Sequence, residues 1–346
     1  MTTLKDVARV AGVSVSTASY VMSGNGLDKI RDVTRNRVLT AADSLGYKVN
    51  MAGRLLQGGP SQTIGIIECQ RSIPIFSELM QMVSRKLDTM GYRTNYRIAN
   101  VNPDNIDKEQ EAVNDAVACH VDGIILAFYN KFRTFPREKC TVPLTIFNGT
   151  EPDVKVNHEH GTYLAVQHLI GHGHRKIGYV LPDNPHNLSK LNGYRRALCE
   201  AGIEPDSNWL AKIFPTHRWR EELDRLVFEE KVTAVCASND TYAVNTMQYF
   251  KWRGIRIPDD VAMFGYDGLS YVDWLEVPLS TVVQPVELLG ETIARVMLDK
   301  IARKDMKPPA EPYDLLPRLH LGQSCGCRTR QGCPDIAWAD ISVYLK

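Results

Sequence analysis

Short apolar runs alternate with stretches of helical periodicity through most of this 346-residue chain, and this alternation constrains its fold more than any other feature. The apolar runs predict strands at residues 63–68, 93–98, 123–127, 144–147, 177–181, 234–237 and 261–266. The stretches between them predict helices around residues 76–90, 107–119, 161–171, 190–201, 218–230 and 240–253. Strands separated by helices of this length are typical of parallel doubly wound sheets, here in two subdomains.

The residues before the Gly58-Gly59-Pro60 break carry a different pattern, that of three short helices. An apolar stripe predicts a helix at 4–11, and Gly12 follows where the chain must turn sharply. Ser14 is a good N-cap for a second helix at 15–22. A third helix at 34–45 ends at Gly46. This arrangement predicts a helix-turn-helix unit, whose second helix enters the major groove of DNA.

Candidate DNA contacts follow from the position of the second helix. They are Val15, Ser16, Thr17 and Tyr20, with Ser19 and Arg9 or Lys5 nearer the phosphates. Residues 1–59 hold eight basic and four acidic side chains, a net charge of +4, whereas the remainder holds 33 basic and 36 acidic, a net charge of −3. A positive head suits a polyanion such as DNA. An ordinary helical bundle is the alternative, because a helix-turn-helix pattern alone is a weak signal.

Three segments of the head carry a stronger signal. They are LKDVARVAGVSVSTASYVMSG, VTRNRVLTAADSLGYKVN and MAGRLLQ, and together they resemble the head of the lactose-repressor/galactose-repressor (LacI/GalR) family. The resemblance implies a hinge helix after the third helix, which enters the minor groove as one of a pair. It places the family's hinge positions on Tyr47, Asn50, Arg54 and Leu56, with Leu56 as the wedge between base pairs.

The head departs from the family pattern at three positions. Val49 stands where the family usually has proline, and Gly53 stands where it usually has alanine. Glycine inside a helix costs about 1 kcal/mol relative to alanine, so this hinge should fold less readily off DNA. Tyr20 replaces an arginine found in many relatives, so the operator should differ from those of arginine-bearing relatives.

The resemblance extends into the core, through the runs DGIIL, HLIGHGHRKIGYV, GYRRALCEAGI, TAVCASND, GIRIPDDVAMFGYD and LSTVVQPVELLG. It implies an α/β fold class: a small all-α helix-turn-helix head and a periplasmic-binding-protein-like core of two doubly wound parallel-sheet lobes. The implied organisation is a head at 1–46, a hinge at 47–60, a core at 61–330 and a tail at 331–346. Within the core, the N-lobe would hold about 61–157 and 286–317, and the C-lobe about 158–285 and 318–330.

Candidate effector contacts lie at the carboxyl ends of the predicted strands, where the cleft would be. Asn239 and Asp267 follow strands and can bond hydroxyl groups. The resemblance adds Gln284, Lys190 in place of a usual arginine, and Ile75 and Phe76 from the N-lobe. It also adds Phe214 at an aromatic position, with Ile213 as the alternative because the match needs one gap. Asn157 and His158 stand where the family usually has aspartate. A helix cap is the competing interpretation of a polar residue at a strand end. A sugar or sugar derivative is the favoured effector.

The cysteines and histidines do not predict a metal site or an active site. Cys325-Gly326-Cys327 with Cys333 lacks a fourth ligand at the usual spacing, which favours an ordinary tail. The histidines at 158, 160, 168, 172 and 174 do not form H-E-x-x-H, and G-x-S-x-G, a phosphate loop and a dinucleotide fingerprint are absent from the sequence. We therefore expect no cofactor and no enzyme activity.

The expected protein is a ligand-controlled transcriptional regulator, most simply a repressor, that binds double-stranded DNA as a homodimer at a near-palindromic operator. The N-terminus has no continuous apolar segment of an export signal, and no apolar run approaches a membrane span, so we expect a cytoplasmic protein with reduced thiols. A ligand-binding module that never meets DNA, or an enzyme on the same core, remains an alternative. The sequence leaves open whether ligand releases or promotes DNA binding.

Overall fold

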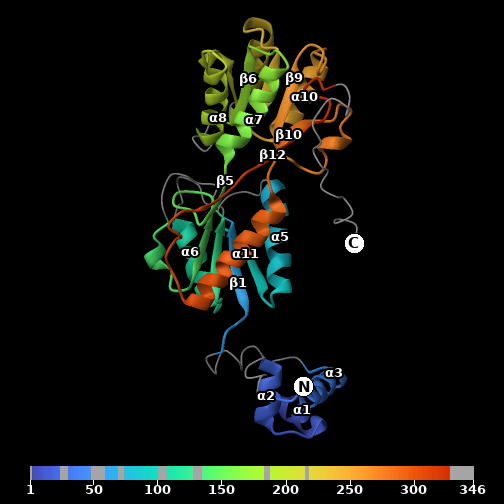
Figure 1. The fold of residues 1–346 in the computed structure, drawn as a ribbon, viewed down its shortest axis with the longest axis vertical. Coiled ribbons are helices and arrows are strands. Elements are labelled where there is room, and N and C mark those ends of the chain that lie inside the picture. Colours follow the sequence, from blue (N-terminus) through green and yellow to red (C-terminus); the bar gives the residue numbers. More distant parts are fainter. Residues whose placement is uncertain are drawn as a thin grey trace. The chain divides into compact units, whose positions relative to one another are not determined.

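The computed structural model describes residues 2–23, 30–47, 59–68, 74–99, 107–127, 135–182, 188–214 and 218–327. The chain divides into two compact units, Met1–Gln62 and Thr63–Lys346 (Figure 1). The second unit contains two six-stranded sheets with helices packed against them. This confirms the expected fold class of a helical head and a doubly wound α/β core.

The first unit contains the helices α1 (Leu4–Ala11), α2 (Val15–Ser23) and α3 (Asp32–Ser44). Thr3 and Asp6 form a capping box at the start of α1, and Gly12 ends it with a φ of 62°. The Ser14 hydroxyl accepts a hydrogen bond from the Thr17 backbone N–H at 3.0 Å, which confirms Ser14 as the cap of α2. The buried core of this unit consists of Val7, Ala8, Ala11, Ala18, Val21, Val38, Ala41 and Ala42.

The first sheet of the core has the strand order β11-β5-β4-β3-β1-β2 and is parallel at every described pairing. Its strands are β1 (Thr63–Glu68), β2 (Arg93–Ile98), β3 (Gly123–Ala127), β4 (Leu144–Phe147), β5 (Val154–Val156) and β11 (Tyr313–Leu315). The helices α5 (Pro74–Thr89) and α11 (Val286–Arg303) lie side by side on one face, and α6 (Asp107–Ala118) lies on the other (Figure 1). Lys300 of α11 donates to Asp153 Oδ1 at 2.5 Å, beside β5.

The second sheet has the order β12-β10-β9-β8-β6-β7, in which only β12 is antiparallel to its neighbour among the described pairings. Its strands are β6 (Ile177–Pro182), β7 (Leu210–Phe214), β8 (Ala234–Ala237), β9 (Ala262–Asp267), β10 (Ser280–Val283) and β12 (Arg318–His320). The helices α7 (His158–Gly171), α8 (Leu188–Glu200), α9 (Trp219–Asp224) and α10 (Asp240–Trp252) cover it. Short helical turns span Arg137–Lys139, Ser207–Trp209, Arg225–Glu229 and Val272–Trp274.

The chain crosses between the two sheets three times. It passes from β5 into α7, from β10 into α11, and from β11 into β12. The first and third crossings touch, because the Asn157 backbone N–H donates to the Leu315 carbonyl at 2.9 Å and its Nδ2 donates to Asp314 at 3.0 Å. Sheet one thus takes its strands from 63–156 and 313–315, and sheet two from 177–283 and 318–320.

The structure contains a strand or a helix at each predicted core segment, but it also contains elements that the apolar pattern does not predict. The expected strand at 261–266 is one residue too early, and the expected helix at 218–230 is α9 followed by a π-helical turn at Arg225–Glu229. The apolar pattern predicts none of β5, β7, β10, β11, β12 and α11. Among the described residues, no helix combines the length and the apolar character needed to cross a membrane.

Candidate functional site

The outer surface of α2 carries the predicted DNA-contacting side chains. Val15, Ser16 and Tyr20 are exposed, and Tyr20 retains 55% of its accessible surface. Thr17 and Ser19 are half-buried, and the Thr17 hydroxyl lies 2.8 Å from the Ser14 hydroxyl. Ala18 faces the other way and is fully buried among the head helices. This helix therefore has one face for packing and one for solvent or a partner.

The predicted hinge lies mostly outside the described residues. Asn50, Arg54 and Leu56 fall in the segment 48–58, so their roles remain predictions from the family resemblance. Tyr47 is half-buried against the core of the head.

Three predicted effector residues meet at the carboxyl edge of the second sheet. Asp267 ends β9, Gln284 follows β10, and Lys190 lies in the first turn of α8. Gln284 Nε2 donates to Asp267 Oδ1 at 2.8 Å, and Lys190 Nζ lies 4.0 Å from the same oxygen. Lys190 Nζ also donates to the Ser238 carbonyl at 2.6 Å. All three side chains are at least 90% buried, so the structure gathers a compact polar cluster inside the core.

Asp267 is the most unusual member of this cluster. Its φ of 117° lies in a region that residues other than glycine rarely adopt. Such strain costs roughly 1–3 kcal/mol and is concentrated at functional sites. Burial raises the pKa of Asp267 to about 6, although the Lys190 charge and the Gln284 hydrogen bond act in the opposite direction. The carboxyl group is therefore held in a poorly solvated position.

Asp240 belongs to the same cluster and was missed by the sequence analysis. Its carboxylate accepts hydrogen bonds from the Gly268 and Leu269 backbone N–H groups, both at 2.8 Å, and from the Thr281 hydroxyl at 2.5 Å. Burial, and then the charge of Asp267, raises the pKa of Asp240 to about 8, although the three hydrogen bonds act to lower it. These bonds fix the loop after Asp267. In the sequence, the nearest indication of Asp240 is that it directly follows Asn239, which was predicted.

Asn239 follows β8 by two residues, as expected, and it is also the N-cap of α10. Its Oδ1 accepts a hydrogen bond from the Tyr242 backbone N–H at 2.7 Å, so it has a structural role whatever else it contacts. The neighbouring Ser238 hydroxyl is buried and has no hydrogen-bond partner among the described residues. For Phe214 the structure describes the backbone, in β7, but not the side chain.

The helix α5 packs against the first sheet, and its first turn carries Ile75 and Phe76, both of which are buried. The Phe76 ring packs against the Phe147 ring edge to face, with centroids 6.0 Å apart. Glu78, one turn after Ile75, is close enough to Asp267 for that charge to add to the effect of burial in raising the pKa of Glu78. Glu78 was not predicted, although its i+3 position from Ile75 places it on the same helix face.

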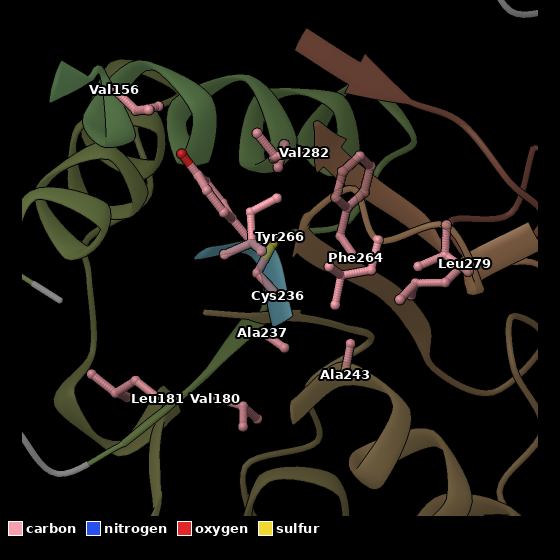
Figure 2. Close-up of a cluster of buried hydrophobic side chains, with 14 of the residues drawn as sticks. Val156, Val180, Leu181, Cys236, Ala237, Ala243, Phe264, Tyr266, Leu279 and Val282 are labelled. Atoms are coloured by element: carbon pink, nitrogen blue, oxygen red, sulfur yellow. The ribbon is translucent and has the colours of Figure 1, made fainter. Parts of the chain in front are cut away.

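Tyr266 joins the polar cluster to the first crossing between the sheets. Its ring lies 3.6 Å from Lys190 Nζ, and its hydroxyl lies 2.9 Å from His158 Nδ1. Figure 2 shows Tyr266 among the buried apolar side chains of β8, β9 and β10, with its hydroxyl pointing toward Val156 at the end of β5. Asn157 caps α7 by accepting a bond from the His160 backbone N–H at 2.9 Å. Asn157 and His158 thus hold the crossing together.

The buried carboxyl group of Asp267 predicts a pH dependence of stability. Because its folded-state pKa of about 6 exceeds the ordinary value of 3.8, the folded chain retains a proton that the unfolded chain releases between these values. Stability should therefore fall as pH rises through this window. Asp267→Asn keeps the acceptor for Gln284 but removes the titration. The melting temperature of the variant minus that of the parent should therefore increase from pH 4.5 to pH 7. A difference that stays constant over this range would contradict the assignment.

Both units have counterparts in known proteins. The family model described as bacterial regulatory proteins, lacI family, matches residues 3–50, and a periplasmic binding protein-like domain matches residues 166–325. The HTH-type transcriptional repressor PurR of Vibrio atlanticus (strain LGP32) is 31% identical over 318 residues, which cover 88% of this chain and 93% of that protein.

Solved structures resemble the chain over nearly its whole length. A lac repressor dimer bound to operator and the anti-inducer ONPF has a TM-score of 0.78 and 24% identity, and the match covers 94% of this chain and 99% of that one. A complex of the transcriptional regulator CelR with cellobiose has a TM-score of 0.66 and 25% identity, and the match covers 94% of this chain and 100% of that one. The head and the core are therefore found together in these proteins.

Proposed function

We propose, from the premise that this chain belongs to the LacI family of bacterial regulatory proteins, that it is a homodimeric repressor controlled by a sugar-like molecule bound in its core. Two identical heads would bind a near-palindromic operator, with α2 of each head in a major groove. Val15, Ser16 and Tyr20 are the side chains that would reach base edges, and Leu56 of each hinge would enter the minor groove.

The observation that carries the effector proposal is the buried cluster of Lys190, Asp267 and Gln284 at the carboxyl edge of the second sheet. A carboxyl group, an ammonium group and an amide offer both donors and acceptors within a few ångströms, which suits adjacent hydroxyl groups on a sugar ring. The Ser238 hydroxyl, which lacks a partner among the described residues, adds one more such group. The relative solved with cellobiose supports this class of ligand.

Control of DNA binding would follow from differential affinity for two arrangements of the lobes. The proposed ligand would contact the second sheet through Asp267 and the first sheet through the face of α5 that carries Glu78. A ligand that prefers one lobe arrangement shifts the equilibrium by that preference, and such couplings are typically about 1–3 kcal/mol. The lobe movement would then change how the two hinges pair.

A thermal-shift screen tests the effector proposal. Sugars, sugar phosphates and nucleosides should be compared, because a ligand that binds the folded state raises its melting temperature. We expect the shift caused by a sugar hit to disappear in Asp267→Ala and to persist in Asp299→Ala, the removal of an exposed carboxylate on α11. A shift of equal size in both variants would place the ligand elsewhere.

A further inference from the structure

One histidine of α7, the histidine that caps its C-terminus and two cysteines near the end of the described chain form a cluster that the effector site does not use. His168 Nε2 lies 3.3 Å from Cys325 Sγ and 3.6 Å from Cys327 Sγ. These three atoms lie within 4.8 Å of one another. His172, one helical turn after His168, places its Nε2 3.4 Å from Cys327 Sγ. Four side chains of metal-ligating type therefore gather from segments more than 150 residues apart.

Three sulfur–nitrogen distances in the cluster are those of a tetrahedral zinc site; His168, Cys325 and Cys327 form the compact ligand group, and His172 adjoins it through Cys327. Zinc bonds to sulfur at about 2.3 Å and to imidazole nitrogen at about 2.0–2.1 Å, so a tetrahedral angle separates sulfur from nitrogen by about 3.5 Å. The three sulfur–nitrogen distances of 3.3, 3.4 and 3.6 Å bracket this value. Two sulfur and two nitrogen ligands in a tetrahedron are characteristic of zinc.

Ser324 attaches the segment that carries Cys325 and Cys327 to the second sheet. The Ser324 hydroxyl donates to the Met263 carbonyl at 2.7 Å and accepts from the Ser280 backbone N–H at 2.8 Å. Gly326, between the two cysteines, has a φ of 90°, which residues with a side chain rarely adopt. The backbone that leads into Cys325 is thus fixed by bonds of Ser324 to β9 and β10 that do not involve the histidines.

The cluster runs from the core to the surface. Cys325 is fully buried, His168 and Cys327 are half-buried, and His172 is exposed. An ion can therefore reach the cluster from solvent, while the buried ligands shield it from water. The His168 ring also packs edge to face on Phe264 of β9, with centroids 5.7 Å apart, which restricts its orientation.

We propose that Cys325, Cys327, His168 and His172 bind one Zn²⁺ ion, which fastens the segment after β12 to α7. The sequence did not suggest this site, because the cysteine pair lacks further ligands nearby and the histidines lie at i and i+4 on a helix far away along the chain. The bound ion would act on the helix that begins at His158, next to the first crossing between the lobes.

Metal binding to the full-length, reduced chain tests the proposal. After removal of metal by a chelator and dialysis against Zn²⁺, metal analysis should find one zinc ion per chain. Co²⁺ in its place should give the visible absorption of a tetrahedral site and thiolate-to-cobalt charge transfer. His172→Ala and Cys327→Ser should each weaken Zn²⁺ binding by at least about tenfold, since even outer-shell partners are worth that much.

The matched controls are Cys199→Ser, which removes an exposed cysteine of α8, and Cys333→Ser, which removes the nearby cysteine outside the described residues. Both should keep full Zn²⁺ affinity and the cobalt spectrum. His172 is exposed, so His172→Ala keeps the test decisive even if Cys327→Ser does not fold. A reduced parent chain that takes up neither metal, or a His172→Ala chain with unchanged affinity, would overturn the proposal.

Discussion

A chain that begins at Thr63 is expected to lose sequence-specific binding of duplex DNA, a loss of about 10³-fold or more in affinity for the operator. The removed residues form one of the two compact units of the chain, and residues 1–59 carry a net charge of +4 on a chain whose remainder carries −3. Both the groove-reading helix and most of the electrostatic attraction for DNA would therefore disappear together.

The operator for this experiment comes from selection of duplexes from a genomic library by the intact chain. Fluorescence anisotropy then compares the selected duplex with a scrambled one. Tyr20→Ala should cost about tenfold in affinity for the selected duplex, as expected for one base contact. Val33→Ala, which shortens an exposed side chain on α3, should cost nothing. A truncated chain that still prefers the selected duplex would place the DNA-binding surface in the core.

Gly193→Ala is expected to destabilise the core by about 3 kcal/mol or more, the upper end of what overpacking costs. Gly193 lies where α8 crosses α7, and a Cβ atom there would stand 2.0 Å from the Glu159 carbonyl oxygen and 3.0 Å from the Tyr163 backbone nitrogen. Backbone atoms of a helix cannot move aside individually, so the two helices would have to separate.

Gly171→Ala is the matched control, because it also adds a methyl group to a helical glycine. Nothing lies within 4 Å of its would-be Cβ atom, so we expect a gain of roughly 0.5–1 kcal/mol from helix propensity. Urea unfolding followed by circular dichroism measures both changes. Because Lys190 lies one turn before Gly193 on α8, the Gly193→Ala chain should also bind a sugar ligand more weakly. Equal stability of the two variants would show that the α7–α8 crossing is less tight than described.

The part of this molecule that sequence reasoning predicts is the part governed by local rules. Gly12 ends α1 and Ser14 caps α2 as expected, because the conformational freedom of glycine and the hydrogen bond of a cap depend only on nearby residues. The strands β1, β3 and β8 are fully buried apart from the first residue of β1, so each appears in the sequence as an apolar run. The three-residue strands β5 and β11 leave no such pattern.

The candidate sites depend on contacts between distant segments, and here the sequence is less informative. Asp267, Gln284 and Lys190 were expected near one another only through the family resemblance, and the structure brings them together. The charge of Asp267 contributes to the raised pKa of Glu78, which lies 189 residues earlier in the chain on α5, and no local pattern predicts this. The contact between His168 and Cys325 was not predicted for the same reason, because neither the histidine pair nor the cysteine pair indicates a metal site on its own segment.

Operator affinity measured with and without a sugar that raises the melting temperature tests the central claim most directly. We expect a saturating concentration of that sugar to change the operator Kd of the intact chain by about 5- to 150-fold, the usual range of allosteric coupling. The change should vanish in a folded Asp267→Ala chain that still binds the operator. An operator Kd that stays the same while the sugar occupies the core would contradict control of DNA binding by this site.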